Sequence, residues 1–118
     1  MLAVVVEDEI SICLIYKRVL EKLGYQVIEA LDGESALVVL ERYQPDIIFL
    51  DMLLPKVNGV TVLNYITTSA HLAHVPTIIV SSNKQFEAMA QTHPSVGFVL
   101  KPIRPEQIRH YALNTSMA

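Results

Sequence analysis

The sequence predicts an α/β protein built as a doubly wound, five-stranded parallel sheet with helices on both faces. Five short apolar segments alternate with five segments in which apolar residues recur at helical spacing. The first, third and fourth apolar segments are uninterrupted runs, which is typical of central parallel strands covered on both faces. Strict alternation of strand and helix requires right-handed crossovers, and these place helices on both sides of one sheet.

The predicted elements are bounded by turn and capping residues. The predicted strands are Ala3–Val6, Tyr25–Ala30, Asp46–Leu50, Thr77–Ser81 and Gly97–Leu100. The second strand carries Gln26 and Glu29, so we expect it at an edge of the sheet. Five helices are predicted. The first ends before Gly24, the second begins near Asp32-Gly33 and ends before Pro45, and the third follows Gly59. The fourth runs from Lys84 to about Thr92, and the fifth begins at Pro105.

Composition narrows the classes of function. The chain has 118 residues and a mass of 13.2 kDa, which suit a single domain. Its net charge of −3 and pI near 5.7 argue against nucleic-acid binding by this chain alone. The apolar runs are too short to cross a membrane, and the acids from Glu7 onward come too early for a signal peptide. The single Cys13 fits a core position and a reducing compartment, so we expect a cytoplasmic protein.

Charged and polar residues follow the predicted strands where this fold would bind a ligand. In doubly wound sheets, ligands bind beyond the carboxyl ends of the strands, near the point where the strand order reverses. The residues at those ends are Glu7, Asp8, Asp51, Ser81 and Lys101. We therefore expect three carboxylates and one ammonium to meet at one edge of the sheet.

Three ionised carboxylates repel one another strongly unless a cation joins them. Their oxygens suit Mg²⁺, and with this ion and Lys101 the formal charges of the cluster sum to zero. A carboxylate beside Mg²⁺ and a lysine can attack a phosphoryl group to give an acyl phosphate. Ser81 could donate its hydroxyl to a phosphoryl oxygen, and a contact made only in that state would shift a conformational equilibrium.

On these residues the chain resembles the receiver domain of two-component response regulators over essentially its whole length. The matching pieces are the acidic pair in Val6-Glu7-Asp8-Glu9, the Asp32-Gly33-Glu34 turn, Asp51 followed by Pro55 and Gly59, Ser81, and Lys101-Pro102. The resemblance implies a flavodoxin-like (βα)5 fold with strand order 2-1-3-4-5. It implies one receiver domain over residues 1–118, with no output domain in this chain. The activity it implies is that of a phosphorylatable switch, not of an enzyme that turns over an external substrate.

The resemblance also assigns the metal ligands. Asp51 would accept the phosphoryl group from a sensor histidine kinase or a histidine phosphotransfer protein. Asp8 and Asp51 would bind Mg²⁺, or Mn²⁺ in its place, and Glu7 would hold it largely through water. The backbone carbonyl of Leu53 would complete the protein ligands.

Further roles concern the bound phosphoryl group. Lys101 would pair with its oxygens, and the backbone N–H groups of Leu53 and Ser82 would contact them. Ser81 would be the switch hydroxyl, and Phe98 would be the aromatic residue that changes rotamer.

The resemblance implies a cis peptide between Lys101 and Pro102. We further expect Leu53 and Asn83 to tune hydrolysis of the acyl phosphate, with bulky Leu53 slowing it. The downstream effector is unknown, no membrane partner is expected, and the family leaves a homodimer open.

Other interpretations remain open beside this one. A degenerate receiver would bind partners without phosphorylation, and the short fourth helix leaves room for it. A haloacid-dehalogenase-like phosphatase would need a second Asp where Leu53 stands. A flavin-binding protein of this topology would need a phosphate-cradling loop where residues 7–9 are acidic. Asp51 could also be only a helix cap, Glu9 is best interpreted as a solvated acid, and His71 with His74 lacks a third metal ligand.

Overall fold

Five parallel strands form a single sheet in the computed structural model, which describes residues 1–116. The strands are β1 (Leu2–Val6), β2 (Gln26–Ala30), β3 (Ile47–Asp51), β4 (Thr77–Ser81) and β5 (Val96–Leu100). Their order across the sheet is β2-β1-β3-β4-β5, and each neighbouring pair is parallel. This order confirms the predicted fold class and places β2 at an edge, as its polar residues indicated.

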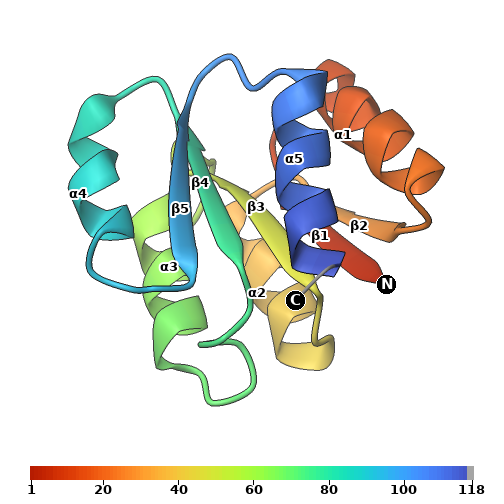
Figure 1. Cartoon of the computed structure of the whole chain (residues 1–118). Helices are drawn as coiled ribbons and strands as arrows, with labels where there is room; N and C mark the ends of the chain where they lie inside the picture. Colours follow the sequence, from red (N-terminus) through yellow and green to blue (C-terminus); the bar gives the residue numbers. More distant parts are fainter. Residues whose placement is uncertain (117–118) are drawn as a thin grey trace.

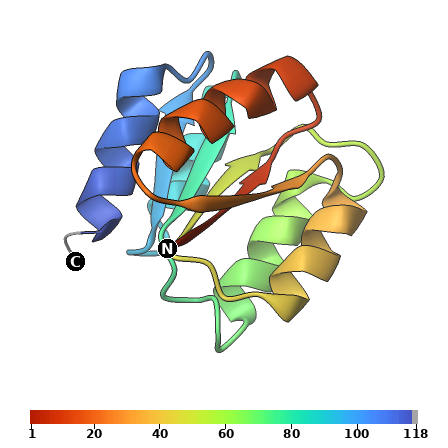
Figure 2. The ribbon, with the colours of Figure 1, turned by 90° about the vertical axis from the view of Figure 1, so that its right-hand side faces the viewer.

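Helices cover both faces of the sheet (Figures 1 and 2). They are α1 (Ile10–Lys22), α2 (Gly33–Arg42), α3 (Gly59–Thr68), α4 (Glu87–Ala90) and α5 (Pro105–Ser116). Helices α1 and α5 lie side by side on one face, and α2 and α3 lie on the other. Because the sheet is covered on both sides, its central strands can be apolar throughout.

Side-chain alternation along each strand produces two separate apolar layers. In β3, Ile47 and Phe49 pack toward α1 and α5, whereas Ile48 and Leu50 pack toward α2 and α3. All four side chains are fully buried. The continuous apolar run of β3 is therefore the consequence of having one helical layer on each side.

The fourth helix is shorter than the sequence predicted. A 3-10 turn, η1 (Lys84–Phe86), leads into the single helical turn of α4, and the chain has left the helix by Gln91. Only Phe86, Met89 and Ala90 from this segment pack against the core, so a longer helix would bury little more apolar surface.

The third strand ends one residue later than predicted, because Asp51 pairs in register with Val80 of β4. Asp51 is thus the last residue of a buried strand rather than the first residue of a loop. The remaining predicted strands agree with the structure to within one residue at each end.

Candidate metal and phosphoryl-transfer site

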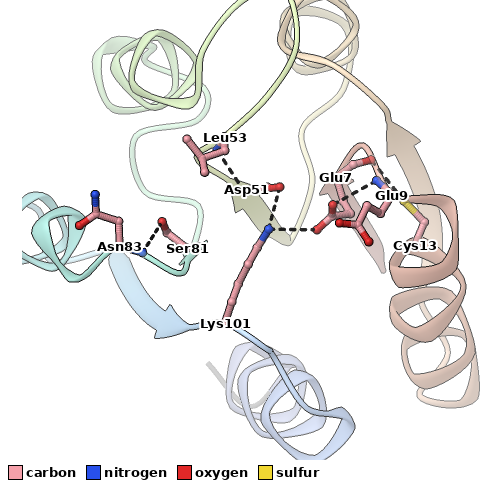
Figure 3. A network of polar contacts seen from close by, with 8 residues as sticks. All are labelled: Glu7, Glu9, Cys13, Asp51, Leu53, Ser81, Asn83 and Lys101. Carbon is pink, nitrogen blue, oxygen red and sulfur yellow. Dashed lines mark hydrogen bonds and ion pairs between the residues drawn. The ribbon is translucent and has the colours of Figure 1, made fainter.

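The predicted acidic cluster assembles at the carboxyl edge of the sheet, where β1, β3 and β5 end. Glu7 directly follows β1, Asp51 ends β3, and Lys101 directly follows β5. The ammonium of Lys101 lies 3.0 Å from Asp51 Oδ2 and 4.0 Å from Glu7 Oε1 (Figure 3). Glu7 is 2% exposed and Asp51 is 3% exposed. Two buried carboxylates therefore share one ammonium.

The acidic cluster has the donor set of a divalent-cation site. One oxygen from each of Glu7, Asp8 and Asp51 lies within 4.8 Å of the others. Asp8 is exposed, so an ion bound there would be reached from solvent. Carboxylate oxygens are the preferred ligands of hard ions such as Mg²⁺, and this ion usually keeps several of its waters. The residues present therefore fit Mg²⁺.

Burial and neighbouring charges shift the pKa values of Glu7 and Lys101. Burial raises the pKa of Glu7 to about 7, and the charge of Asp51 adds to this effect. A hydrogen bond from the Glu9 N–H, at 3.1 Å, acts against it. For Lys101, burial alone would lower the pKa, but the hydrogen bond and charge of Asp51 outweigh it and raise the pKa. At neutral pH the lysine is charged, and Glu7 lies near its midpoint.

The backbone N–H of Leu53 lies at the Asp51 carboxylate. It donates to Asp51 Oδ1 at 3.1 Å, which orients the carboxylate while Lys101 holds the other oxygen. Leu53 is 64% exposed, and its side chain lies beside Asp51 (Figure 3). A bulky apolar group thus borders the solvent approach to Asp51.

Ser81 lies at the end of β4 and belongs to a separate contact. Its hydroxyl oxygen is buried and accepts a hydrogen bond from the Asn83 N–H at 3.1 Å. The Asn83 side chain caps η1 by accepting from the Gln85 N–H, and Ser82 is exposed. The acids and Lys101 are brought together, whereas the Ser81 hydroxyl bonds within its own loop.

The other residues singled out in the sequence are also placed. The Lys101-Pro102 peptide is cis. Phe98 is half-buried in β5 and packs against the apolar layer beneath α2, α3 and α4. His71 and His74 bond to different partners, the Leu40 carbonyl and the Gln44 side chain, which supports the interpretation that they are not a metal pair.

Cys13 is buried, as predicted, and its thiol donates to the Glu7 carbonyl at 3.4 Å.

The sequence did not reveal the close contact between Gly33 and the loop that follows Asp51. At this contact, a Cβ added to Gly33 would lie 1.8 Å from the Val57 carbonyl oxygen. The only sequence signal was a glycine at the start of a helix, and it did not indicate which segment would approach it.

The fold and this site define a class of protein that comparison with known proteins also identifies. The chain matches the response regulator receiver domain over residues 3–113. It therefore belongs to the response regulator receiver domain family. Members of this family are signalling switches of two-component systems that interact with histidine kinases and downstream effectors.

Curated proteins are similar to this chain over part of its length. The alkaline phosphatase synthesis transcriptional regulatory protein PhoP of Bacillus subtilis is 31% identical over 104 residues, covering 88% of this chain and 43% of that protein. The chain thus spans less than half the length of PhoP and of other transcriptional regulators that it matches.

Two solved structures show the same fold. Chemotaxis response regulator CheY4 of Vibrio cholerae is similar with a TM-score of 0.85 and 22% identity, covering 97% of each chain. The receiver domain of sensor histidine kinase PA1611 from Pseudomonas aeruginosa has a TM-score of 0.85 and 23% identity, covering 99% of this chain and 98% of that one. That receiver holds a magnesium ion in its active site cleft.

In the part of the chain that the structure describes here, no helix is long and apolar enough to cross a membrane.

Proposed function

We propose that this chain is a phosphorylatable switch in which Asp51 accepts a phosphoryl group from a histidine kinase or a histidine phosphotransfer protein. The observation that carries the proposal is the sharing of one ammonium by two buried carboxylates, Glu7 and Asp51. Such a cluster has a deficit of positive charge, which a divalent cation would remove. Family membership supports the same function.

The geometry around Asp51 suits attack on phosphorus. One carboxylate oxygen accepts from the Leu53 N–H and the other from Lys101, so the group is held at a fixed angle. A carboxylate oxygen of Asp51 would form the new P–O bond while the bond from phosphorus to the donor breaks and its electron pair leaves with the donor. The Lys101 ammonium would then also stabilise the negative charge of the phosphoryl oxygens.

We propose Mg²⁺ as the cation, with Asp8 and Asp51 as side-chain ligands, Glu7 holding it largely through water, and the Leu53 carbonyl as a backbone ligand. A bound Mg²⁺ would offset the charge of the acids and that of the phosphoryl oxygens. Mn²⁺, which also prefers oxygen ligands, is expected to substitute for it. The magnesium ion in the PA1611 receiver domain supports this choice.

The output of the switch would pass through Ser81 and Phe98. In the unphosphorylated chain Ser81 bonds to the Asn83 N–H, and we expect its hydroxyl to turn toward a phosphoryl oxygen when one is present. The backbone N–H of Ser82 would contact the same group. Movement of this loop would free space for Phe98 to change rotamer and alter the surface near β5.

We further propose that residues 1–118 act as one receiver domain, that the output lies outside this chain, and that the switch works in the cytoplasm. In this proposal the phosphorylated chain would act on a downstream effector and could form a homodimer. It would not turn over an external substrate.

Incubation with acetyl phosphate tests the proposed function. We expect wild-type protein to take up one phosphoryl group in the presence of Mg²⁺, seen as a shifted band on a Phos-tag gel. Uptake should be lost in EDTA and in Asp51→Asn, which keeps the size of the side chain. If the wild-type protein takes up no phosphate and binds its partners equally with and without beryllofluoride, the chain is a degenerate receiver.

A further inference from the structure

We infer that Gly33 is a positioning residue for the metal and phosphoryl site, an inference that rests on the function proposed above. Gly33 is the first residue of α2, at the end of the turn that follows β2, and lies some distance along the chain from Asp51. It contacts the loop of residues 52–58, which joins β3 to α3 and carries Leu53. Through this contact the turn would set the position of the loop at the site.

The contact is between backbone atoms and leaves no room for a side chain. A Cβ on Gly33 would lie 1.8 Å from the carbonyl oxygen of Val57 and 2.6 Å from its carbonyl carbon. The Gly33 N–H also donates to the Pro55 carbonyl at 3.2 Å. Because no flexible side-chain end stands in the way, any other residue at position 33 must shift the backbone at this contact, and we expect the loop to move.

The loop has little freedom to absorb such a displacement at its two ends. Its first residue, Met52, is buried and accepts a hydrogen bond from the Gly59 N–H at 3.2 Å. A Cβ on Gly59 would lie 2.5 Å from Met52 Cα, so this second contact is equally close. The residues between, which include Leu53, must therefore take up the change.

A second feature connects the same turn and loop. Lys56 has a left-handed φ of 68°, which is uncommon for a residue other than glycine. Its ammonium lies 3.7 Å from Asp32, the residue before Gly33. An ion pair thus also connects the turn to the residue of the loop that has this uncommon backbone conformation.

The site would feel this displacement through Leu53. The Leu53 N–H orients the Asp51 carboxylate, and its carbonyl is the proposed backbone ligand of the metal. Losing a group that supports metal ligands typically weakens metal binding about 10- to 100-fold. We therefore expect Gly33→Ala to weaken Mg²⁺ binding about tenfold or more.

The matched control is Gly24→Ala, the same substitution at a site remote from the loop. Gly24 follows α1 with a φ of 91°, and a Cβ there meets nothing within 4 Å. Alanine at this position strains the backbone and lowers stability without displacing the loop. Mg²⁺ affinity, measured by calorimetry on each folded variant, should stay within about twofold of wild type for Gly24→Ala.

The rate of phosphorylation by acetyl phosphate at increasing Mg²⁺ separates positioning from general destabilisation. For Gly33→Ala the half-saturating Mg²⁺ concentration should rise by the same factor as the dissociation constant. If Gly33→Ala binds Mg²⁺ as tightly as Gly24→Ala, Gly33 has no positioning role, and the proposed function stands. If wild-type protein binds no Mg²⁺, the proposed function fails and this inference fails with it.

A measurement on wild-type protein covers the case in which Gly33→Ala does not fold. The chain has four glycines, so a ¹⁵N-glycine-labelled sample gives four amide signals. If Mg²⁺ binds more tightly when Gly33 is in contact with the loop, bound Mg²⁺ must stabilise that contact by the same factor. Exchange of the Gly33 amide should therefore slow about tenfold with saturating Mg²⁺, and that of Gly24 should not change. Unchanged Gly33 exchange at full Mg²⁺ occupancy would overturn the inference.

Discussion

Glu7 lies close to its titration midpoint at neutral pH, and this follows from its surroundings. It is buried beside Asp51, and burial raises its pKa to about 7 from an ordinary value of 4.5. Lys101 opposes this effect, but its ammonium is nearer to Asp51 than to Glu7. The charge of the whole site therefore depends on one proton at Glu7.

This proton predicts how metal affinity changes with pH. Mg²⁺ binds the ionised carboxylate, so below about pH 7 its binding must displace the Glu7 proton, and the affinity falls as the pH falls. Lys101 has a raised pKa and stays charged throughout this range, so it does not contribute. Calorimetric titration should give a dissociation constant up to about tenfold weaker at pH 6 than at pH 8.

Glu7→Gln is the control for this pH dependence. The amide has nearly the same size and cannot titrate, so its Mg²⁺ affinity should be almost equal at the two pH values. Equal affinities of the wild-type protein at pH 6 and pH 8 would contradict the displacement of a Glu7 proton by Mg²⁺.

Leu53 is the residue through which hydrolysis of an acyl phosphate would be tuned. It is 64% exposed, and its backbone N–H already bonds to Asp51. We predict that Leu53→Asn increases the dephosphorylation rate by about twofold or more, because an amide can orient a water that leucine excludes. Val38→Asn, at an exposed position on α2, should leave the rate unchanged. An unchanged rate in Leu53→Asn would contradict the role given to this side chain.

At the scale of elements, α3 fixes the far end of the loop that follows Asp51. Its N-cap is Asn58, whose side chain accepts from the Thr61 N–H at 2.9 Å. Asn58→Ala should lower the free energy of unfolding by about 1 kcal/mol in urea denaturation, because that N–H loses its acceptor. Asn58→Asp should retain nearly all of the stability. A loss in Asn58→Asp equal to that in Asn58→Ala would show that the cap contributes nothing.

The predictions of strands and helices were correct where the local sequence pattern agrees with the final packing. The apolar runs that became β1, β3 and β4 needed only to be covered on both faces. The helix expected over residues 84–92 was wrong in length because its end depends on how much apolar surface η1 and α4 can bury. Pairing with β4 likewise decided that Asp51 belongs to β3, and the sequence of β3 does not contain that information.

At the scale of the whole molecule, stability depends on the two apolar layers on either side of the sheet. Phe49 of β3 is fully buried in the layer beneath α1 and α5, and its ring centroid lies 5.1 Å from that of Tyr16. Phe49→Ala should lower the free energy of unfolding by about 3–5 kcal/mol in urea denaturation. Tyr43→Ala, at an exposed position, should cost under about 0.5 kcal/mol. Equal losses would contradict the assignment of Phe49 to the core.

The positions of the site residues followed from the topology. Carboxyl ends of parallel strands meet at one edge, so the placement of Glu7, Asp51 and Lys101 could be predicted from strand order alone. The Ser81 bond to Asn83 and the contact of Gly33 with Val57 could not, because each depends on the conformation of a loop. Local patterns fix the ends of strands more firmly than the course of the loops between them.

The most direct test of the central claim is to locate the phosphoryl group on the chain. An acyl phosphate can be reduced by borohydride, which converts the modified aspartate to homoserine, and peptide mass spectrometry then identifies the position. After treatment with acetyl phosphate and Mg²⁺, we predict conversion at Asp51, and none when EDTA replaces the metal. Conversion at another carboxylate, or equal conversion without Mg²⁺, would contradict a metal-dependent phosphoryl acceptor at the end of β3.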